Sequence, residues 1–168
     1  MKVDLPRDFK ELLEEFDRDA VEWLLGGGYA VAFHGRPRAT NDIDLVLEGS
    51  PVNLARAATA LARFGAPANV VAAAAVMKES DVVFLGQPSL RIDLLRTIDG
   101  VDSKALFADA VVTELDGLRL RVISFDHLVA NKRAAGRPQD LLDAEFLEKL
   151  RARRLAIKGV TRPSSSSK

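Results

Sequence analysis

Two aspartates separated by one residue stand inside an apolar stretch of the chain. Asp42 and Asp44 flank Ile43 in the segment DIDLVLEG, whose apolar positions predict a β-strand. Side chains alternate faces along a strand, so both carboxylates point to one side, about 7 Å apart. Carboxylates so placed repel each other and are costly beside a core. A pair of hard divalent cations removes that cost, and such pairs stabilise both oxygens of a phosphoryl displacement.

The same pair is also explained by an edge strand whose polar face happens to carry two aspartates. Taken alone, the pattern favours this plainer explanation by roughly two to one, because short motifs often arise by chance. A second segment, RIDLL at 91–95, places Asp93 inside another apolar strand candidate. A strand-terminal aspartate on a solvated face is common, but an acid among apolar residues is rarer than one in a loop. If the two strands are neighbours, Asp93 completes a three-carboxylate site.

Three consecutive glycines, Gly26 to Gly28, follow the short apolar stretch from Trp23 to Leu25. The next segment, YAVAFHG, is either a strand, as its apolar character suggests, or a short helix, which its alanines permit. As a helix it would offer a phosphate free N–H donors and a favourable dipole. Otherwise the glycines form a flexible turn or allow close packing. The sequence contains neither a G-x-G-x-x-G pattern here nor a Walker lysine after the glycines.

The rest of the sequence predicts a mixed α/β (α+β) domain whose C-terminal part is helical. Turn and cap residues bound most of its elements, such as Ser50-Pro51 at a helix start and Asp116-Gly117 in a hairpin. The expected helices are 7–19, 51–65, 103–109, 124–135 and 139–154; the expected strands, beyond those above, are 69–76, 81–85, 90–94 and the two arms of the 111–123 hairpin.

Length and composition predict a single soluble domain over residues 1–156, followed by a disordered polar tail at 157–168. The 24 basic and 24 acidic side chains cancel, which excludes a binder that relies on a general surplus of positive charge. There is no cysteine, as suits a reducing cytoplasm. The longest apolar run, from Val70 to Met77, is far short of the roughly 20 residues that span a membrane.

The segment GGGYAVAFHGRPRATNDIDLVL, together with the later RIDLL, resembles the polymerase-β-type nucleotidyltransferase superfamily. That pattern is a Gly-Gly or Gly-Ser turn, a spacer, two acids on one strand and a later lone acid on a neighbouring strand. Thirteen residues separate Gly28 from Asp42, within the family's range. With RVISFDHLVANKRAAGRPQDLLDAEFL, the chain is similar to small bacterial minimal nucleotidyltransferases, including relatives of abortive-infection toxins and toxin–antitoxin modules. The resemblance covers most of the chain.

The resemblance implies a nucleotidyltransferase fold, with helices packed on a small mixed sheet and two C-terminal helices at about 124–154. It implies a short strand ending at Gly27 and a helix from Gly28 to about Gly35, so it resolves the ambiguous YAVAFHG segment as helix. One slight departure is Gly26, which stands where the family has a larger apolar residue.

The resemblance also implies the roles of site residues. Gly27 and Gly28 contact the triphosphate of a bound nucleotide. Asp42, Asp44 and Asp93 bind two magnesium or manganese ions, and Asp93 assists deprotonation of an acceptor hydroxyl.

Five further residues have two readings each. Lys132 resembles a lysine that toxin-type relatives hold near the nucleotide, and a solvated helix face explains it equally well. Asp140 resembles an acid that accompanies this lysine, but a favourable charge near a helix N-terminus explains it better. For Arg36 and Arg38 an exposed loop is preferred over contact with phosphates or RNA. For His34 packing at a helix end is preferred over acid–base catalysis.

The function expected from these residues is transfer of a nucleoside monophosphate from an NTP to an acceptor hydroxyl. A tRNA 3′ end, a protein side chain or a small molecule is the expected acceptor, and the protein is expected to work in the cytoplasm, with a possible toxin–antitoxin partner and no membrane. The alternative is a binding module, or an antitoxin-type partner protein, that keeps the nucleotide fold without catalysis. The presence of all three acids favours the enzyme. A histidine-rich hydrolase is not supported, because the chain has only His34 and His127.

Overall fold

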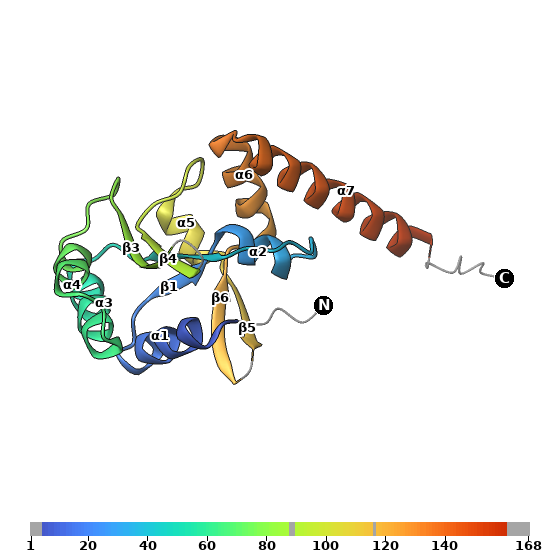
Figure 1. The fold of residues 1–168 in the computed structure, drawn as a ribbon. Helices are drawn as coiled ribbons and strands as arrows, with labels where there is room; N and C mark the ends of the chain where they lie inside the picture. Colours follow the sequence, from blue (N-terminus) through green and yellow to red (C-terminus); the bar gives the residue numbers. More distant parts are fainter. Residues whose placement is uncertain (1–4, 88–89, 116, 161–168) are drawn as a thin grey trace.

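The computed structural model describes residues 5–87, 90–115 and 117–160 of the chain (Figure 1). Helices and strands are interspersed along it and two helices come last. The elements are α1 (Arg7–Arg18), β1 (Trp23–Leu25), α2 (Gly27–Phe33), β2 (Asp42–Leu47), α3 (Pro51–Phe64), α4 (Ala68–Ala75), β3 (Val82–Gln87), β4 (Leu90–Leu95), α5 (Ser103–Ala108), β5 (Val111–Leu115), β6 (Leu118–Val122), α6 (Phe125–Ala135) and α7 (Pro138–Val160).

One six-stranded mixed sheet runs through the molecule in the order β3-β4-β2-β1-β6-β5. The β2–β4 and β1–β6 pairs are parallel, and the other three neighbouring pairs are antiparallel. The central strands β2 and β4 therefore lie side by side although more than forty positions separate them in the sequence. This confirms the predicted fold class and the predicted adjacency of the two acid-bearing strands.

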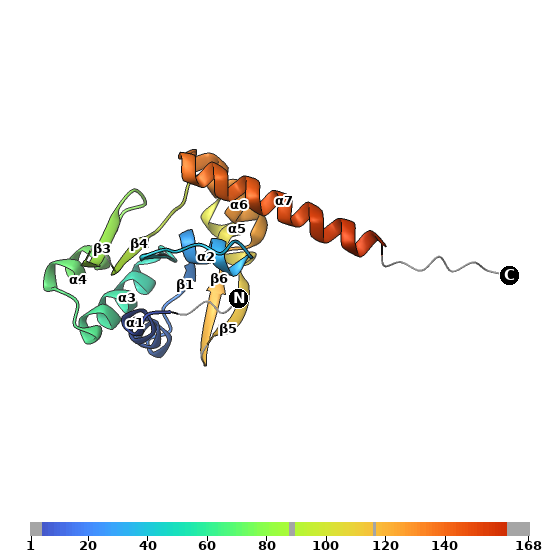
Figure 2. The same cartoon turned by 45° about the vertical axis from the view of Figure 1, so that its right-hand side comes forward.

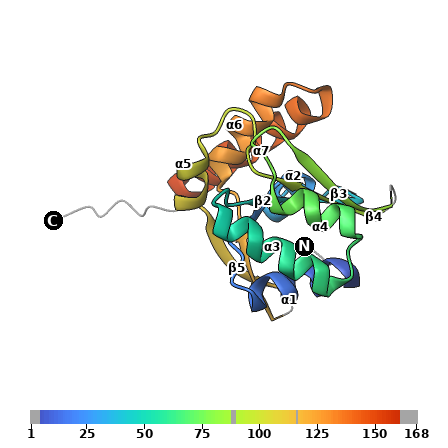
Figure 3. The ribbon, with the colours of Figure 1, turned by 90° about the vertical axis from the view of Figure 1, so that its left-hand side faces the viewer.

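Helices cover the apolar face of the sheet and pack their own apolar faces against it. Helix α1 buries Phe9, Leu12, Leu13 and Phe16 at the spacing of one helix face. Ile43 and Leu45 of β2 are fully buried on the same side of their strand, in one core with these residues. Figures 1 and 3 show α1, α3 and α4 grouped together, whereas α6 and α7 lie at the opposite end. Within the described residues, no helix is long and apolar enough to cross a membrane.

Local cap chemistry sets the bounds of α3 as the sequence predicts. The Ser50 side chain accepts a hydrogen bond from the Asn53 N–H, and Pro51 occupies the first turn. The helix stops at Gly65, whose φ of 94° is in the left-handed region. The helices predicted at 7–19, 103–109 and 124–135 are likewise present. The first five residues of YAVAFHG are helical in α2; β1 ends at Leu25 rather than Gly27, and α2 begins at Gly27 and ends at Phe33.

Three expectations need correction or completion. The apolar run 69–76 is not a strand but helix α4; a short apolar run has no periodicity that tells the two apart, and here it packs on α3 after Pro67. The last helix does not end near Arg154 but continues to Val160, and Figure 2 shows it running away from the sheet. The hairpin β5–β6 is confirmed, while Asp116 of its turn and the tail residues 161–168 lie outside the described residues.

Buried Asn53 at the start of α3 ties together the strands that carry the site. Its amide donates to the carbonyl oxygens of Glu22 and Glu48 at 2.9 and 2.8 Å, and its Oδ1 accepts from the Glu22 N–H at 2.7 Å. Glu22 precedes β1 and Glu48 follows β2, so one side chain fixes the ends of both strands.

Replacing Asn53 with alanine is expected to lower the free energy of unfolding by about 3 kcal/mol, because three part-buried hydrogen bonds to the backbone are lost. Urea unfolding followed by circular dichroism measures this loss. Thr59→Ala, on the exposed side of the same helix, is the control and should change stability by less than about 0.5 kcal/mol. Equal losses in the two variants would contradict the role given to Asn53.

Candidate functional site

The parallel pairing of β2 with β4 places polar side chains opposite one another. In this register Asp42 faces Arg91 and Asp44 faces Asp93, with the apolar pair Ile43 and Ile92 between them on the core side. The Asp93 strand is therefore the direct neighbour of the DID strand. Asp93 is only 8% exposed, so its carboxylate is partly withdrawn from water.

An open cleft of about 880 Å³ lies over this face of the sheet, a volume in the range of ligand sites. It brings together every residue that the sequence singled out most strongly. These are Gly27, Gly28, Asp42, Asp44, Asp93 and Lys132. Four separate elements contribute them: the start of α2, β2, β4 and α6.

The glycine turn between β1 and α2 lies directly against the second aspartate. The Gly26 N–H donates to the Asp44 carbonyl oxygen at 2.9 Å. Gly27 has a φ of +56°, and a Cβ on it would be 1.7 Å from the Asp44 Oδ2. A Cβ on Gly28 would be 2.8 Å from the Thr40 Oγ1. Only glycine fits at position 27, because any side chain there would overlap the carboxylate.

Asp44 is the acid with the most unfavourable surroundings for a charge. Burial, and then the neighbouring charge of Asp93, raise its pKa from 3.8 to about 6, although Lys132 acts in the opposite direction. A carboxylate in this position gains from a cation supplied from outside.

The positively charged Arg91 contacts two of the three acids, Asp93 and Asp42. Its guanidinium donates to both oxygens of Asp93 at 2.6 and 2.9 Å, and it lies 3.4 Å from the Asp42 Oδ2. Asp42 Oδ1 is buried and has no hydrogen-bond partner. As the side chains stand, no three histidine or acidic side chains in the described ranges converge closely enough to hold a metal ion.

The donor set nevertheless suits a hard divalent cation. Carboxylate oxygens are the ligands that magnesium and manganese prefer, and the unpaired oxygen of Asp42 is one such ligand. The three acids belong to directly paired strands and line one cleft, so their carboxylates face the same space.

Lys132 is buried in the wall of the cleft rather than solvated on a helix face. Its Nζ lies 2.6 Å from Asp140 and 3.7 Å from Asp143, both on α7. Burial alone would raise the pKa of Asp140, but hydrogen bonds from Lys132 and Arg137 lower it. Asp140 is thus both near the start of α7 and the partner of the lysine, as the resemblance implied.

Arg36 and Arg38 are not free loop residues, which corrects the reading preferred from the sequence. Each donates to one oxygen of Asp143 at 2.5 Å, and Asp143 is completely buried. The buried Asp143 carboxylate on α7 thus lies close to positive charges from two other segments, the loop before β2 and α6. The loop before β2 is thereby fastened to the C-terminal helices.

His34 packs at the end of α2, as expected. Its Nε2 lies 2.7 Å from the Ile123 carbonyl oxygen, and its ring meets those of Phe33 and Phe125 edge to face. Burial lowers its pKa, which favours the neutral ring.

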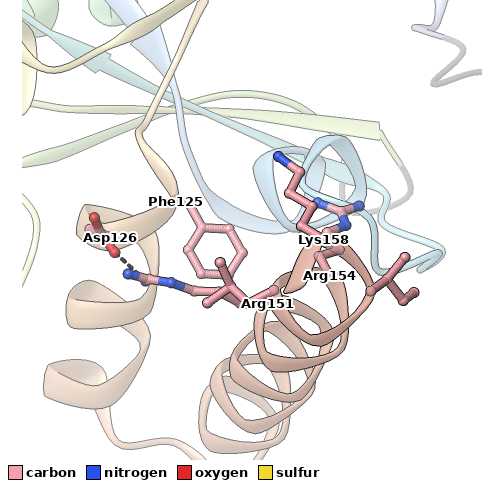
Figure 4. Close-up of a pocket in the computed structure, with 7 residues that line it drawn as sticks. Phe125, Asp126, Arg151, Arg154 and Lys158 are labelled. Carbon is pink, nitrogen blue, oxygen red and sulfur yellow. Dashed lines mark hydrogen bonds and ion pairs between the residues drawn. The ribbon is translucent and has the colours of Figure 1, made fainter. Parts of the chain in front are cut away.

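A second cavity, of about 450 Å³, lies between α6 and the end of α7 (Figure 4). Its walls are largely apolar, and its polar groups include an ion pair between Asp126 and Arg151, whose guanidinium also lies over the Phe125 ring. None of the three strand acids lines it. The candidate site is therefore placed in the larger cleft, where the carboxylates and the glycine turn meet.

No protein-family model and no curated protein sequence matches the chain. Solved structures do. The lincosamide antibiotic adenylyltransferase LnuA, solved with lincomycin, aligns with a TM-score of 0.57 at 15% identity, over 86% of this chain and 96% of LnuA. The Thermotoga maritima protein TM1012, which carries a nucleotidyltransferase assignment, gives 0.55 at 16%, over 91% and 92%.

The antibiotic-resistance enzyme ANT(2″)-Ia, solved with adenylyl-2″-tobramycin, gives a TM-score of 0.51 at 17% identity, over 92% of this chain and 97% of its own. At such low identities these likenesses show the fold. The chain has a nucleotidyltransferase-like fold.

Sequence reasoning missed two contributors to this site, Arg91 and Asp143. Arg91 stands two positions before Asp93 on one strand, and that spacing alone places both side chains on the same face. Asp143 stands among Leu141, Leu142 and Ala144, so its apolar neighbours were a signal for a buried acid. Nothing in the sequence pairs Asp143 with Arg36 and Arg38, because about a hundred residues separate them.

Gly27→Ala is expected to disrupt the site, because its Cβ would displace the Asp44 carboxylate. Gly65→Ala is the matched control: it also has a positive φ, but its Cβ would meet no atom within 4 Å. Both variants should lose about 1 kcal/mol of stability from backbone strain. Gly27→Ala alone should lose Mn²⁺ binding by calorimetry, and intact binding in that variant would contradict the close contact.

Asp44→Asn is expected to stabilise the metal-free protein at high pH. The folded-state pKa, about 6, exceeds the ordinary value of 3.8, so the ionised carboxylate destabilises the fold increasingly as the pH rises through that window. The asparagine variant should gain about 3 kcal/mol at pH 8 and nearly nothing at pH 3.5. Urea unfolding in EDTA at both pH values measures the gain. A gain that does not depend on pH would show that Asp44 is not a strained anion.

Proposed function

We propose that the protein is a metal-dependent nucleotidyltransferase that moves a nucleoside monophosphate from an NTP to an acceptor hydroxyl. The observation that carries this proposal is the β2–β4 register, which sets Asp44 against Asp93 beside the Gly27 turn. The nucleotidyltransferase-like fold supports it.

In the proposed reaction, the acceptor oxygen attacks the α-phosphorus of the NTP. The bond from the α-phosphorus to the bridging oxygen breaks, and pyrophosphate leaves with the electron pair. The hydroxyl proton passes to a carboxylate or to water. No atom changes its oxidation state in this step, so no redox partner is needed.

Asp42, Asp44 and Asp93 would hold Mg²⁺ or Mn²⁺. When bound, the cations neutralise charge at the phosphates and lower the pKa of the attacking hydroxyl. The protein itself contributes position: Asp44 is held between the glycine turn and β4, and its burial favours binding of a cation over solvation by water.

The triphosphate is proposed to lie along Gly27 and Gly28 with Lys132 nearby. Side chains are absent at both glycines, so the phosphates can approach the backbone closely. Lys132 lines the same cleft, and Asp140 and Asp143 hold its ammonium in place. Arg137, which is mostly exposed and also lines the cleft, adds positive charge at its rim.

The acceptor is proposed to be a hydroxyl of a small molecule, a protein or an RNA 3′ end. LnuA is named as a lincosamide antibiotic adenylyltransferase, and ANT(2″)-Ia was solved with adenylyl-2″-tobramycin. Both names support a small-molecule acceptor. A toxin–antitoxin role would instead require modification of RNA or protein in the same cell. We place the reaction in the cytoplasm, where NTPs are available and a chain without cysteine needs no oxidising conditions.

A binding module with the nucleotide fold is the second candidate. The observation that favours it is Arg91, whose guanidinium lies among the acids where a cation would bind. A module of this kind binds nucleotide without transferring any part of it.

Transfer is tested by incubating the protein with α-³²P-labelled ATP, CTP, GTP or UTP, Mg²⁺ and one acceptor pool. The pools are total RNA, total protein, and lincosamide or aminoglycoside antibiotics. Label should appear in one pool with one preferred nucleotide. Asp44→Ala should reduce labelling at least about a hundredfold, because a metal ligand is lost.

Asp17→Ala removes an exposed acid of α1 outside the cleft and is the control that should label normally. Labelling that survives in Asp44→Ala would contradict the proposed enzyme. Nucleotide binding without label in any pool would favour the binding module.

A further inference from the structure

Arg91 stands out because its guanidinium contacts two of the three strand acids. It is half-buried, it is on the same face of β4 as Asp93, and it faces Asp42 across the strand pair. The Asp93 side chain is 11% exposed and the Asp42 side chain 38%, so these ion pairs are partly shielded from water. A guanidinium stays charged at every working pH.

The guanidinium and a divalent cation need the same oxygens. Both oxygens of Asp93 accept hydrogen bonds from Arg91, and one oxygen of Asp42 lies 3.4 Å from it. The other oxygen of Asp42 is buried without a partner, so the arginine satisfies this site incompletely. A cation that bridges the strands would have to take oxygens that Arg91 now contacts.

The fold also gives the arginine a contact besides the acids. The Arg91 guanidinium lies 4.9 Å from the centre of the Phe84 ring, and Phe84 is directly paired with Asp93 on β3. Phe84 is 52% exposed, so the guanidinium has a cation–π contact at the solvent-facing side of the cleft in addition to its ion pairs.

We propose that Arg91 is a built-in counter-cation, which pairs with Asp42 and Asp93 in the metal-free protein and must give up their oxygens, while keeping its contact with Phe84, when a divalent cation binds. The inference rests on the proposed metal site and adds a residue that regulates its occupancy. Because arginine and metal compete, the metal-free fold is protected from carboxylate repulsion, and the affinity for metal is reduced by the free energy of the ion pairs.

The experiment measures Mn²⁺ binding to the full-length protein without nucleotide, by the electron paramagnetic resonance signal of free Mn²⁺. Arg91→Gln removes the competing charge, so its Kd for Mn²⁺ should fall by about tenfold or more relative to the wild type. Its melting temperature without metal should fall, and Mn²⁺ should raise that temperature more than it does in the wild type.

Arg121→Gln is a closely matched control. Arg121 is 33% exposed, pairs with Glu22 at 3.1 Å, and has its guanidinium 5.9 Å from the Phe107 ring, but it does not line the cleft. Its Mn²⁺ affinity should equal that of the wild type. Arg91→Lys keeps the charge without the two-pronged geometry and should bind Mn²⁺ with intermediate affinity.

If Arg91→Gln does not fold without metal, Arg91→Lys decides: tighter Mn²⁺ binding than wild type supports displacement, and equal or weaker binding overturns it. Unchanged or weaker binding in a folded Arg91→Gln overturns the role of Arg91 alone, provided that wild-type binding is lost in Asp44→Asn. Absence of Mn²⁺ binding in every variant overturns both this inference and the proposed metal site.

Discussion

The parallel pairing of β2 with β4 is the constraint on which the rest of the site depends. It joins two segments distant in the sequence, and its register determines which side chains share a face. With Ile43 and Ile92 directed into the core, Asp42, Asp44, Arg91 and Asp93 are directed into the cleft. A slip of one residue would bury the acids and expose the core, so the hydrophobic pattern that stabilises the sheet also fixes the carboxylates.

The site contains an electrostatic conflict that its surroundings only partly relieve. Burial and like charge work against ionised Asp44, whose carboxylate occupies the space that a Cβ on residue 27 would take. Arg91 offsets part of the charge on the other two acids, and Lys132 acts on Asp44 from the opposite wall. Apolar side chains in these positions would make the protein more stable. Unfavourable charges of this kind are therefore typical of functional sites.

Three positively charged side chains from distant parts of the sequence meet at Asp143, beside the cleft. Arg36 and Arg38 come from the loop before β2, Lys132 comes from α6, and Asp143 itself belongs to α7. Because one buried carboxylate joins these segments, the position of Lys132 depends on the docking of the C-terminal helices. The cleft is therefore a property of the whole described domain, and no single motif defines it.

Local patterns in the sequence were enough for most elements, because caps and glycines mark their ends. Ser50, Pro51 and Gly65 bound α3 as expected, and the D-x-D spacing correctly placed two acids on one face. Failure occurred where only tertiary contacts decide. The run 69–76 has no distinguishing period, and its helix is selected by packing on α3.

The partners of charged groups were similarly beyond local reasoning. The sequence alone left Arg36 and Arg38 in an exposed loop, although both pair with Asp143. Arg91 was visible within RIDLL, but its contact with Asp42 depends on the strand register, which no local pattern contains.

The central claim is that the three strand acids form a divalent-cation site beside the glycine turn. Crystals soaked with Mn²⁺ and a non-hydrolysable NTP analogue, measured at the manganese absorption edge, test it most directly. We expect an anomalous peak beside the carboxylates of Asp44 and Asp93, with the phosphates against Gly27 and Gly28. A nucleotide bound elsewhere, or an occupied nucleotide site with no manganese at these acids, would contradict it.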